Sequence, residues 1–163
     1  MKKINLLIST FFGYGYLTKI PGTVTSLVTT IFIYIAYEYL GYTDLKFSII
    51  FFLLLFFYSF YAVKDAESEF KNKDPRQIVI DEVLGQAMPL IFLLYLKQNN
   101  QISIQIEIYY VFSFIFFRLF DILKPFPVSY FDKNFKNYFG IIMDDIMAGL
   151  YTMLLIYLIS LKF

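Results

Sequence analysis

The fold is decided by a charge-free stretch, FSIIFFLLLFFYSFYAV, at positions 47–63. A helix needs about 20 apolar residues to cross the hydrocarbon core of a membrane, and this stretch comes close to that length with Asp44 and Leu45 before it. The whole chain is similar in character, since its 163 residues are 59% hydrophobic and 22% aromatic, with a mean hydropathy of +0.63. No linker rich in Pro, Ser or Gly divides the chain, so we expect an integral membrane protein with one domain over residues 1–163.

Five hydrophobic helices are predicted along the chain. They cover approximately residues 23–42, 45–63, 78–96, 102–123 and 141–161. Thr23 or Ser26 is placed to cap the first helix, and Pro89 predicts a kink in the third. Residues 1–12 are too few to span a membrane, so some segments are expected to be partial or interfacial. Polar loops are predicted at residues 64–76 and 124–140. The fold class expected is an all-α, polytopic membrane bundle of about five helices.

Ionisable residues gather at the ends of the predicted helices in three groups. These groups are Asp81-Glu82, Arg118 with Asp121 and Lys124, and Asp144-Asp145. If the five helices cross the membrane in alternating directions, all three groups lie on one membrane face, together with eleven of the fourteen Lys and Arg residues. The positive-inside rule makes that face cytoplasmic. Ionisable groups at the rim of an apolar bundle are costly unless they pair or bind an ion, so they mark a candidate site.

The acidic residues predict a metal site. Five carboxylates at one rim would repel one another strongly, and a divalent cation would remove that repulsion. The chain has no Cys and no His, so its metal ligands must be oxygen atoms, which favours Mg²⁺, or Mn²⁺ in its place, over structural zinc. The expected ligands are Asp81, Glu82, Asp144 and Asp145. Neighbouring residues on a helix point about 100° apart, so the sequence leaves open which member of each pair binds directly. Ordinary helix-end charge is the alternative for either pair by itself.

Arg118 and Lys124 add the positive charge that a phosphate group requires. An Arg fork and a Lys charge beside carboxylates and a metal would neutralise the oxygens of a phosphate monoester, so the predicted chemistry is phosphoryl transfer to water. Arg118 and Asp121, three residues apart, also fit an ordinary ion pair. The glycine-rich loop at residues 13–23 is a weaker candidate, in which backbone N–H groups near Thr23 would bind an anion at a helix start.

Other function classes are less well supported by the residues. The net charge of +1 and the scattered basic residues argue against nucleic-acid binding. A cation carrier or channel would use the same acids as an ion-binding ring, but it would need polar residues at mid-membrane depth, which the stretch 47–63 does not provide. A noncatalytic assembly subunit is a further alternative, and it would tolerate loss of the acids.

Four blocks of sequence carry a resemblance to a known family. They are GYGYLTKIPGT at 13–23, DEVLG at 81–85, FRLFDILKPFP at 117–127 and GIIMDDIMAG at 140–149. With these blocks the chain resembles the phosphatidylglycerophosphatase A family of bacterial membrane phosphatases. The resemblance implies a Mg²⁺-dependent hydrolase of phospholipid biosynthesis, which removes the terminal phosphate of phosphatidylglycerophosphate to give phosphatidylglycerol. It also implies a multi-pass protein of the bacterial inner membrane with its active site on the cytoplasmic face.

The resemblance also implies roles for individual positions. Asp81, Glu82, Asp144 and Asp145 would supply metal ligands or a base, and Asp121 would join them as a catalytic residue. Arg118, Lys124 and Thr23 would bind the phosphate of the substrate. Attack on phosphorus by a metal-activated water is the mechanism that we favour, and an aspartyl-phosphate intermediate is the alternative.

Overall fold

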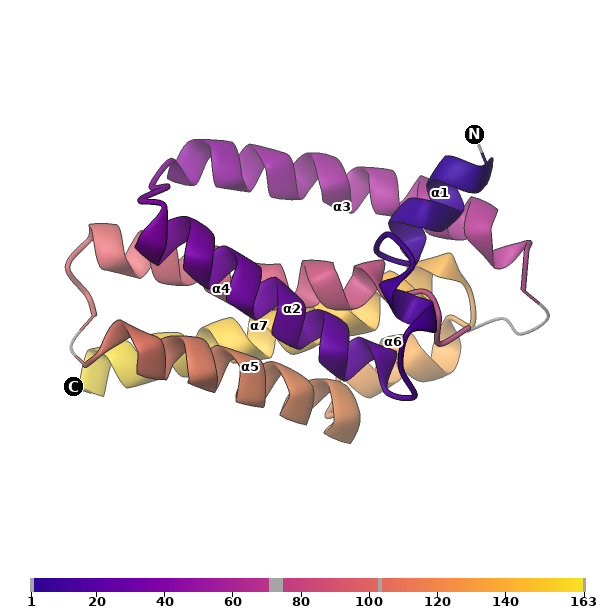
Figure 1. The fold of residues 1–163 in the computed structure, drawn as a ribbon. Coiled ribbons are helices and arrows are strands. Elements are labelled where there is room, and N and C mark those ends of the chain that lie inside the picture. The colour runs from indigo at the N-terminus through magenta and orange to yellow at the C-terminus, as the bar shows by residue number, and fades with distance from the viewer. Residues whose placement is uncertain (1, 71–74, 103, 163) are drawn as a thin grey trace.

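The computed structural model describes residues 2–70, 75–102 and 104–162, and every regular element in these ranges is a helix. The elements in chain order are α1 (Lys2–Ser9), the 3₁₀ helix η1 (Tyr14–Tyr16), α2 (Pro21–Tyr34), the π-helix η2 (Ile35–Tyr39), α3 (Leu45–Glu67), α4 (Ile80–Gln98), α5 (Ile106–Leu123), α6 (Val128–Asn134) and α7 (Tyr138–Lys162) (Figure 1). The predicted all-α class is therefore confirmed.

The five predicted hydrophobic helices correspond to α2 with η2, α3, α4, α5 and α7, but several local predictions were wrong. α3 continues four residues beyond Val63, and α6 lies in a stretch that was predicted to be a loop. Neither Thr23 nor Ser26 caps α2, because that helix begins with Pro21, which needs no backbone donor at this position. The Ser26 hydroxyl donates instead to the Gly22 carbonyl, at 2.9 Å. The predicted helix stop at Asp74 lies outside the described residues.

Two of the described helices, α3 and α7, are long and apolar enough to cross a membrane. They differ in their surroundings. In α7, 50% of the apolar 18-residue stretch that could cross a membrane is buried inside the protein. In α3 the buried share of the corresponding stretch is only 22%. α7 is therefore a central helix, whereas α3 presents most of its surface outward (Figure 1). Full spanning by the other hydrophobic helices stays a prediction.

The contact between α4 and α7 brings two backbones unusually close. A Cβ atom added to Gly149 of α7 would lie 2.5 Å from the carbonyl oxygen of Gly85 in α4. A Cβ atom on Gly85 would lie 2.7 Å from the Asp145 carbonyl oxygen and 2.6 Å from the Phe117 ring. Only glycine permits such an approach. Gly85 lies one turn after Glu82, so this contact places the start of α4 directly against α7 at Asp145. The contact therefore positions the acidic residues.

Candidate metal and phosphate site

Three carboxylates meet where the first turn of α4 faces α7. Asp81 and Glu82 come from α4 and Asp145 from α7, and one carboxylate oxygen of each lies within 4.8 Å of the other two. Asp81 and Asp145 are buried, with relative exposures of 9% and 3%, and Glu82 is partly buried. The start of a helix favours negative side chains through its dipole, but that effect does not account for Asp145, which lies two turns into α7. Three of the four residues in the two predicted acidic pairs therefore come together in one cluster.

Two oxygens of this cluster have no hydrogen-bond partner among the described residues. They are Glu82 Oε2 and Asp145 Oδ2, and both are shielded from solvent. A buried ionised carboxylate without a partner is costly, and a cation removes that cost. Oxygen ligands in this number suit Mg²⁺ or Mn²⁺. The residues present thus fit a divalent cation, although the structure does not identify the metal.

The first turn of α2 packs against this cluster. A Cβ atom on Gly22 would lie 2.1 Å from Glu82 Oε1, so the backbone at Gly22 touches the carboxylate itself. The close approach explains why a glycine stands there. Thr23 is the next residue, but it is not among the residues that line the polar cavity described below. Its role in phosphate binding stays a prediction.

Asp144 belongs to a second group, which is centred on Lys124. The Lys124 ammonium donates to Asp144 Oδ2 at 2.8 Å and to Asp132 Oδ1 at 2.7 Å. Burial opposes its charged form, but the carboxylates of Asp144 and Asp132 outweigh burial and raise the pKa of Lys124. Partial burial raises the pKa of Asp132, but the hydrogen bond and charge of Lys124 lower it below its ordinary value overall. Lys124 therefore stays charged throughout the physiological range.

Arg118 and Asp121 form the ion pair that their spacing allows. Arg118 Nη1 lies 2.9 Å from Asp121 Oδ2, and the same nitrogen donates to Ser26 Oγ at 3.4 Å. Asp121 lines the polar cavity, whereas Arg118 is not among the lining residues. Arg118 thus links α5 to α2 through Ser26, and its place in phosphate binding stays a prediction.

A polar cavity of about 210 Å³ joins these groups at the end of the molecule where α6 lies (Figure 1). Its walls include all five predicted acids and Lys124. The cavity is lined by Arg76, Ile78, Asp81, Glu82, Asp121, Lys124, Asp132, Phe135, Lys136, Gly140, Ile141, Asp144 and Asp145. Carboxylates of α4 and α7 line it together with the cations Arg76, Lys124 and Lys136. Such a cavity can hold a cation and a phosphate group next to each other.

Three charged lining residues were not predicted as site residues: Arg76, Asp132 and Lys136. Asp132 and Lys136 are four residues apart and form an ion pair at 3.7 Å. That spacing is a helical signal, but α6 has only seven residues, too few for a periodic pattern to stand out. The sequence feature that could have identified Asp132 as a site residue is its position between Lys124 and Asp144, two predicted site residues.

Several known proteins are similar to this chain over most of its length. The family model described as phosphatidylglycerophosphatase A matches residues 7–160. A phosphatidylglycerophosphatase A of Haemophilus influenzae is 35% identical over 98% of this chain and 94% of its own length. A putative phosphatidylinositol-3-phosphatase of Bacteroides thetaiotaomicron is 35% identical over 93% and 90%, and a phosphatidylglycerophosphatase A of Escherichia coli is 28% identical over 94% and 82%. No solved structure matches the chain.

Proposed function

This chain belongs to the phosphatidylglycerophosphatase A family and is a phosphatase, and from that premise we propose that it removes the terminal phosphate of phosphatidylglycerophosphate at the acidic cavity with the aid of Mg²⁺, or Mn²⁺ in its place. One observation carries the assignment of the site. The carboxylate oxygens of Asp81, Glu82 and Asp145 lie within 4.8 Å of one another in a cavity that also contains Lys124. The product would be phosphatidylglycerol, and the reaction belongs to phospholipid biosynthesis.

Each charged residue has a separate task in this proposal. Asp81, Glu82 and Asp145 would hold the cation, with Asp144 beside them as a further ligand. A bound Mg²⁺ supplies positive charge that offsets these carboxylates and the oxygens of the phosphoryl group. The Lys124 ammonium, held in place by Asp132 and Asp144, would neutralise charge on the phosphate oxygens.

Hydrolysis forms a bond from a water oxygen to phosphorus and breaks the ester bond from phosphorus to the glycerol oxygen. The water loses a proton and the departing glycerol oxygen gains one. Asp121 lines the cavity outside the three-carboxylate cluster, and we assign to it the acceptance of the proton from water. Its ion pair with Arg118 fixes the orientation of the carboxylate. Thr23, next to the glycine that touches Glu82, would add a backbone donor to the phosphate.

The proposed setting is the bacterial inner membrane. α3 and α7 are apolar enough to span it, and we propose that the other hydrophobic helices complete a multi-pass bundle in a single domain. The acidic cavity would then lie on the cytoplasmic face, where eleven of the fourteen basic residues are expected.

The proposal is tested by measuring phosphate release from phosphatidylglycerophosphate by the purified protein in detergent. We expect release with Mg²⁺ or Mn²⁺ and none with EDTA, and we expect activity to return when Mg²⁺ is added back in excess. Binding of Mn²⁺, followed by its electron paramagnetic resonance signal, gives a readout that does not depend on turnover. Release that persists undiminished in EDTA would exclude the metal, and no release with either metal would exclude the proposed activity.

A second substrate should be tested in the same assay. One relative, as similar to this chain as the Haemophilus influenzae protein at 35% identity, is named as a putative phosphatidylinositol-3-phosphatase. Phosphatidylinositol 3-phosphate is also a phosphomonoester of a lipid alcohol, so the same charges would serve it. We expect kcat/KM to be higher for phosphatidylglycerophosphate. The reverse order would assign the chain to the inositol lipid.

Replacing Lys124 with Met should lower the rate of phosphate release by about 100-fold, because one preorganised charge on the phosphoryl oxygens is lost. Lys133→Met is the matched control, since Lys133 is exposed and is not among the cavity residues. Steady-state phosphate release by both variants, with their unfolding temperatures, is the measurement. Equal activity of the two variants would remove Lys124 from the mechanism.

A further inference from the structure

An apolar groove runs between α2, α3 and α4. We propose that this groove holds an acyl chain of the phospholipid while its phosphate group occupies the acidic cavity. The inference rests on the proposed function, because it assigns the hydrocarbon part of the same substrate. The groove would also explain how an enzyme with a small polar cavity selects a lipid.

The groove has the size and lining of a site for hydrocarbon. Its volume is about 600 Å³, which lies within the range of roughly 300 to 1,000 Å³ that is usual for ligand pockets. Phe32, Phe51 and Leu55 are typical of its walls. Two polar groups at one end, the Tyr37 hydroxyl and the Ser48 hydroxyl, bond to each other at 3.1 Å. Most of the groove therefore offers a ligand apolar contact, and the two hydroxyls satisfy each other.

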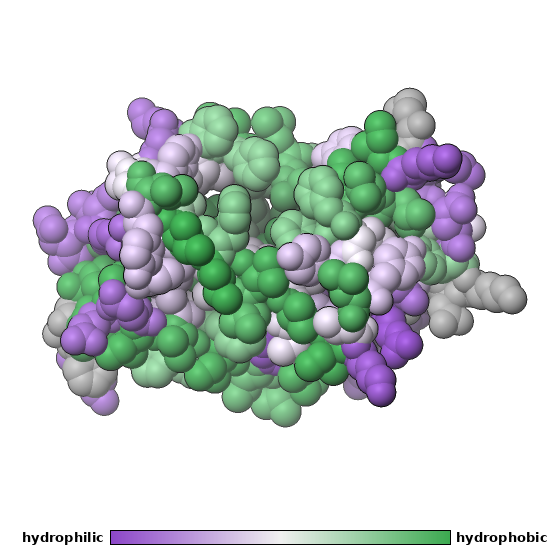
Figure 2. Space-filling model, in the orientation of Figure 1, coloured by the Kyte–Doolittle hydropathy of each residue, from purple (hydrophilic) through white to green (hydrophobic). Residues whose placement is uncertain are grey.

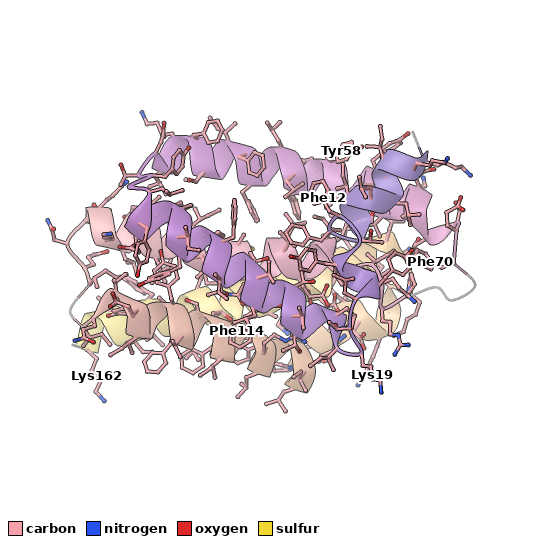
Figure 3. The ribbon with its side chains drawn as sticks, viewed as in Figure 1. Phe12, Lys19, Tyr58, Phe70, Phe114 and Lys162 are labelled. Atoms are coloured by element: carbon pink, nitrogen blue, oxygen red, sulfur yellow. The ribbon has the colours of Figure 1, made fainter. Side chains whose placement is uncertain are left out.

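The groove exists because α3 is held to the rest of the molecule mainly at its C-terminal half. There Asn5 of α1 donates to Asp65 at 2.7 Å and accepts from Tyr58 at 2.6 Å, near the end of α3 where Figure 3 labels Tyr58. Among the described residues, the N-terminal half of α3 has one such side-chain bond, from the Tyr37 hydroxyl of η2 to the Ser48 hydroxyl. Phe47 and Phe51 line the groove and are still 57% and 58% exposed. The surface is accordingly hollowed between α3 and α2 (Figure 2).

Phe12 forms part of the groove wall near α1, and its conformation is unusual. Its backbone has φ of 56°, in the left-handed region that a bulky residue seldom adopts. The side chain is 68% exposed and lies between α1 and α2 in Figure 3. An exposed aromatic ring at this place adds apolar contact for a chain that enters the groove from the membrane.

The groove and the acidic cavity share the first turn of α4. Ile80 and Val83 line the groove, whereas Asp81 and Glu82 line the cavity. From Ile80 to Ile91 the groove follows α4 for about 16 Å at 1.5 Å per residue, which is roughly half of a hydrocarbon core about 30 Å thick. A phospholipid with its phosphate in the cavity thus has its hydrocarbon beside the groove. This continuity, rather than exposure alone, identifies an acyl chain as the occupant.

Filling the groove tests the proposal. Ala87 lines its middle, and Ala87→Phe would occupy that space. Leu54→Phe is the matched control, since Leu54 is 66% exposed on α3 and is not a lining residue. We expect Ala87→Phe to lower kcat/KM by about 10-fold or more for a long-chain phosphatidylglycerophosphate and to leave the dihexanoyl form unchanged. Equal losses for both substrates, or no loss for either, would overturn the acyl-chain assignment.

A photoreactive lipid gives a readout that does not depend on turnover. Phosphatidylglycerophosphate with a diazirine at the end of one acyl chain is irradiated with the protein on ice, and the labelled peptides are mapped. We expect labels on peptides of α2, α3 and α4 that unlabelled phosphatidylglycerophosphate displaces. A phosphatidylcholine probe that labels the same peptides equally would mean bulk lipid in the groove and would overturn the proposal. If no lipid is hydrolysed but specific labelling persists, the proposed phosphatase activity fails while the groove assignment stands as a lipid-binding site.

Discussion

Asp145→Asn is expected to reduce phosphate release by at least about 100-fold, because it removes one negative charge from the acidic cluster that we propose as the metal site. Asparagine has nearly the same size as aspartate, so the packing of α7 is preserved. In EDTA we expect the variant to be at least as stable to heat as the wild type, since a buried carboxylate close to Glu82 and Asp81 is costly without a cation. Activity assays and thermal unfolding in detergent measure the two effects separately.

Glu107→Gln is the control for this prediction. Glu107 is an exposed carboxylate in the first turn of α5, and it is not a lining residue of the acidic cavity. The same chemical change there should leave activity and stability as they are. Wild-type activity of Asp145→Asn would show that the cluster does not serve catalysis, and unfolding of the variant in EDTA would show that the carboxylate is structural.

Gly149→Ala is expected to have the second large effect, on both stability and activity. The added Cβ would lie 2.5 Å from the Gly85 carbonyl oxygen, which belongs to the backbone and can give way only if α4 and α7 separate. Overpacking of this kind costs about 1 to 3 kcal/mol, against a gain of up to about 1 kcal/mol from the helix propensity of alanine. Since the acidic cluster is divided between the two helices, we expect activity to fall by about 100-fold.

The next residue along α7 supplies the control for Gly149→Ala. Leu150 is 42% exposed, and Leu150→Ala should change the unfolding temperature and the activity little. Unfolding temperatures and phosphate release of the two variants in the same detergent are the measurements. A Gly149→Ala protein that is more stable than the wild type, as for an ordinary exposed helix glycine, would contradict the close packing of α4 and α7.

The convergence of the acids could be predicted from the sequence because it depends on few assumptions. The apolar segments are long and well separated, and alternate helix directions place every second junction at the same end. The positions of Asp81 and Asp121 at helix ends, and of Asp145 about two turns from the start of α7, then follow. Which acid of each pair joins the cluster depends on helix rotation, and that rotation is set by the Gly85 and Gly149 contact, which a single sequence does not reveal.

Two other features depended on tertiary contacts. The charged residues after Val63 were interpreted as loop, yet α3 continues because Ala66 is buried and Asp65 bonds to Asn5 while Lys64 faces outward. The role of Asp132 depends on α6, a helix too short to be recognised from its own pattern. In both cases a local preference was weak, and contacts with distant residues decided the structure.

The division of the acidic cluster between α4 and α7 also matters while the protein is being made. Sixty-three residues separate Glu82 from Asp145 along the chain. At about 5 to 20 residues per second, a ribosome needs roughly 3 to 13 seconds to cover that interval. A nascent chain during this time carries two of the three carboxylates and at most the first two turns of α7. We expect hydrolysis to begin only after Asp145 has been added and α7 has docked, so that an unfinished chain does not act on the surrounding lipid.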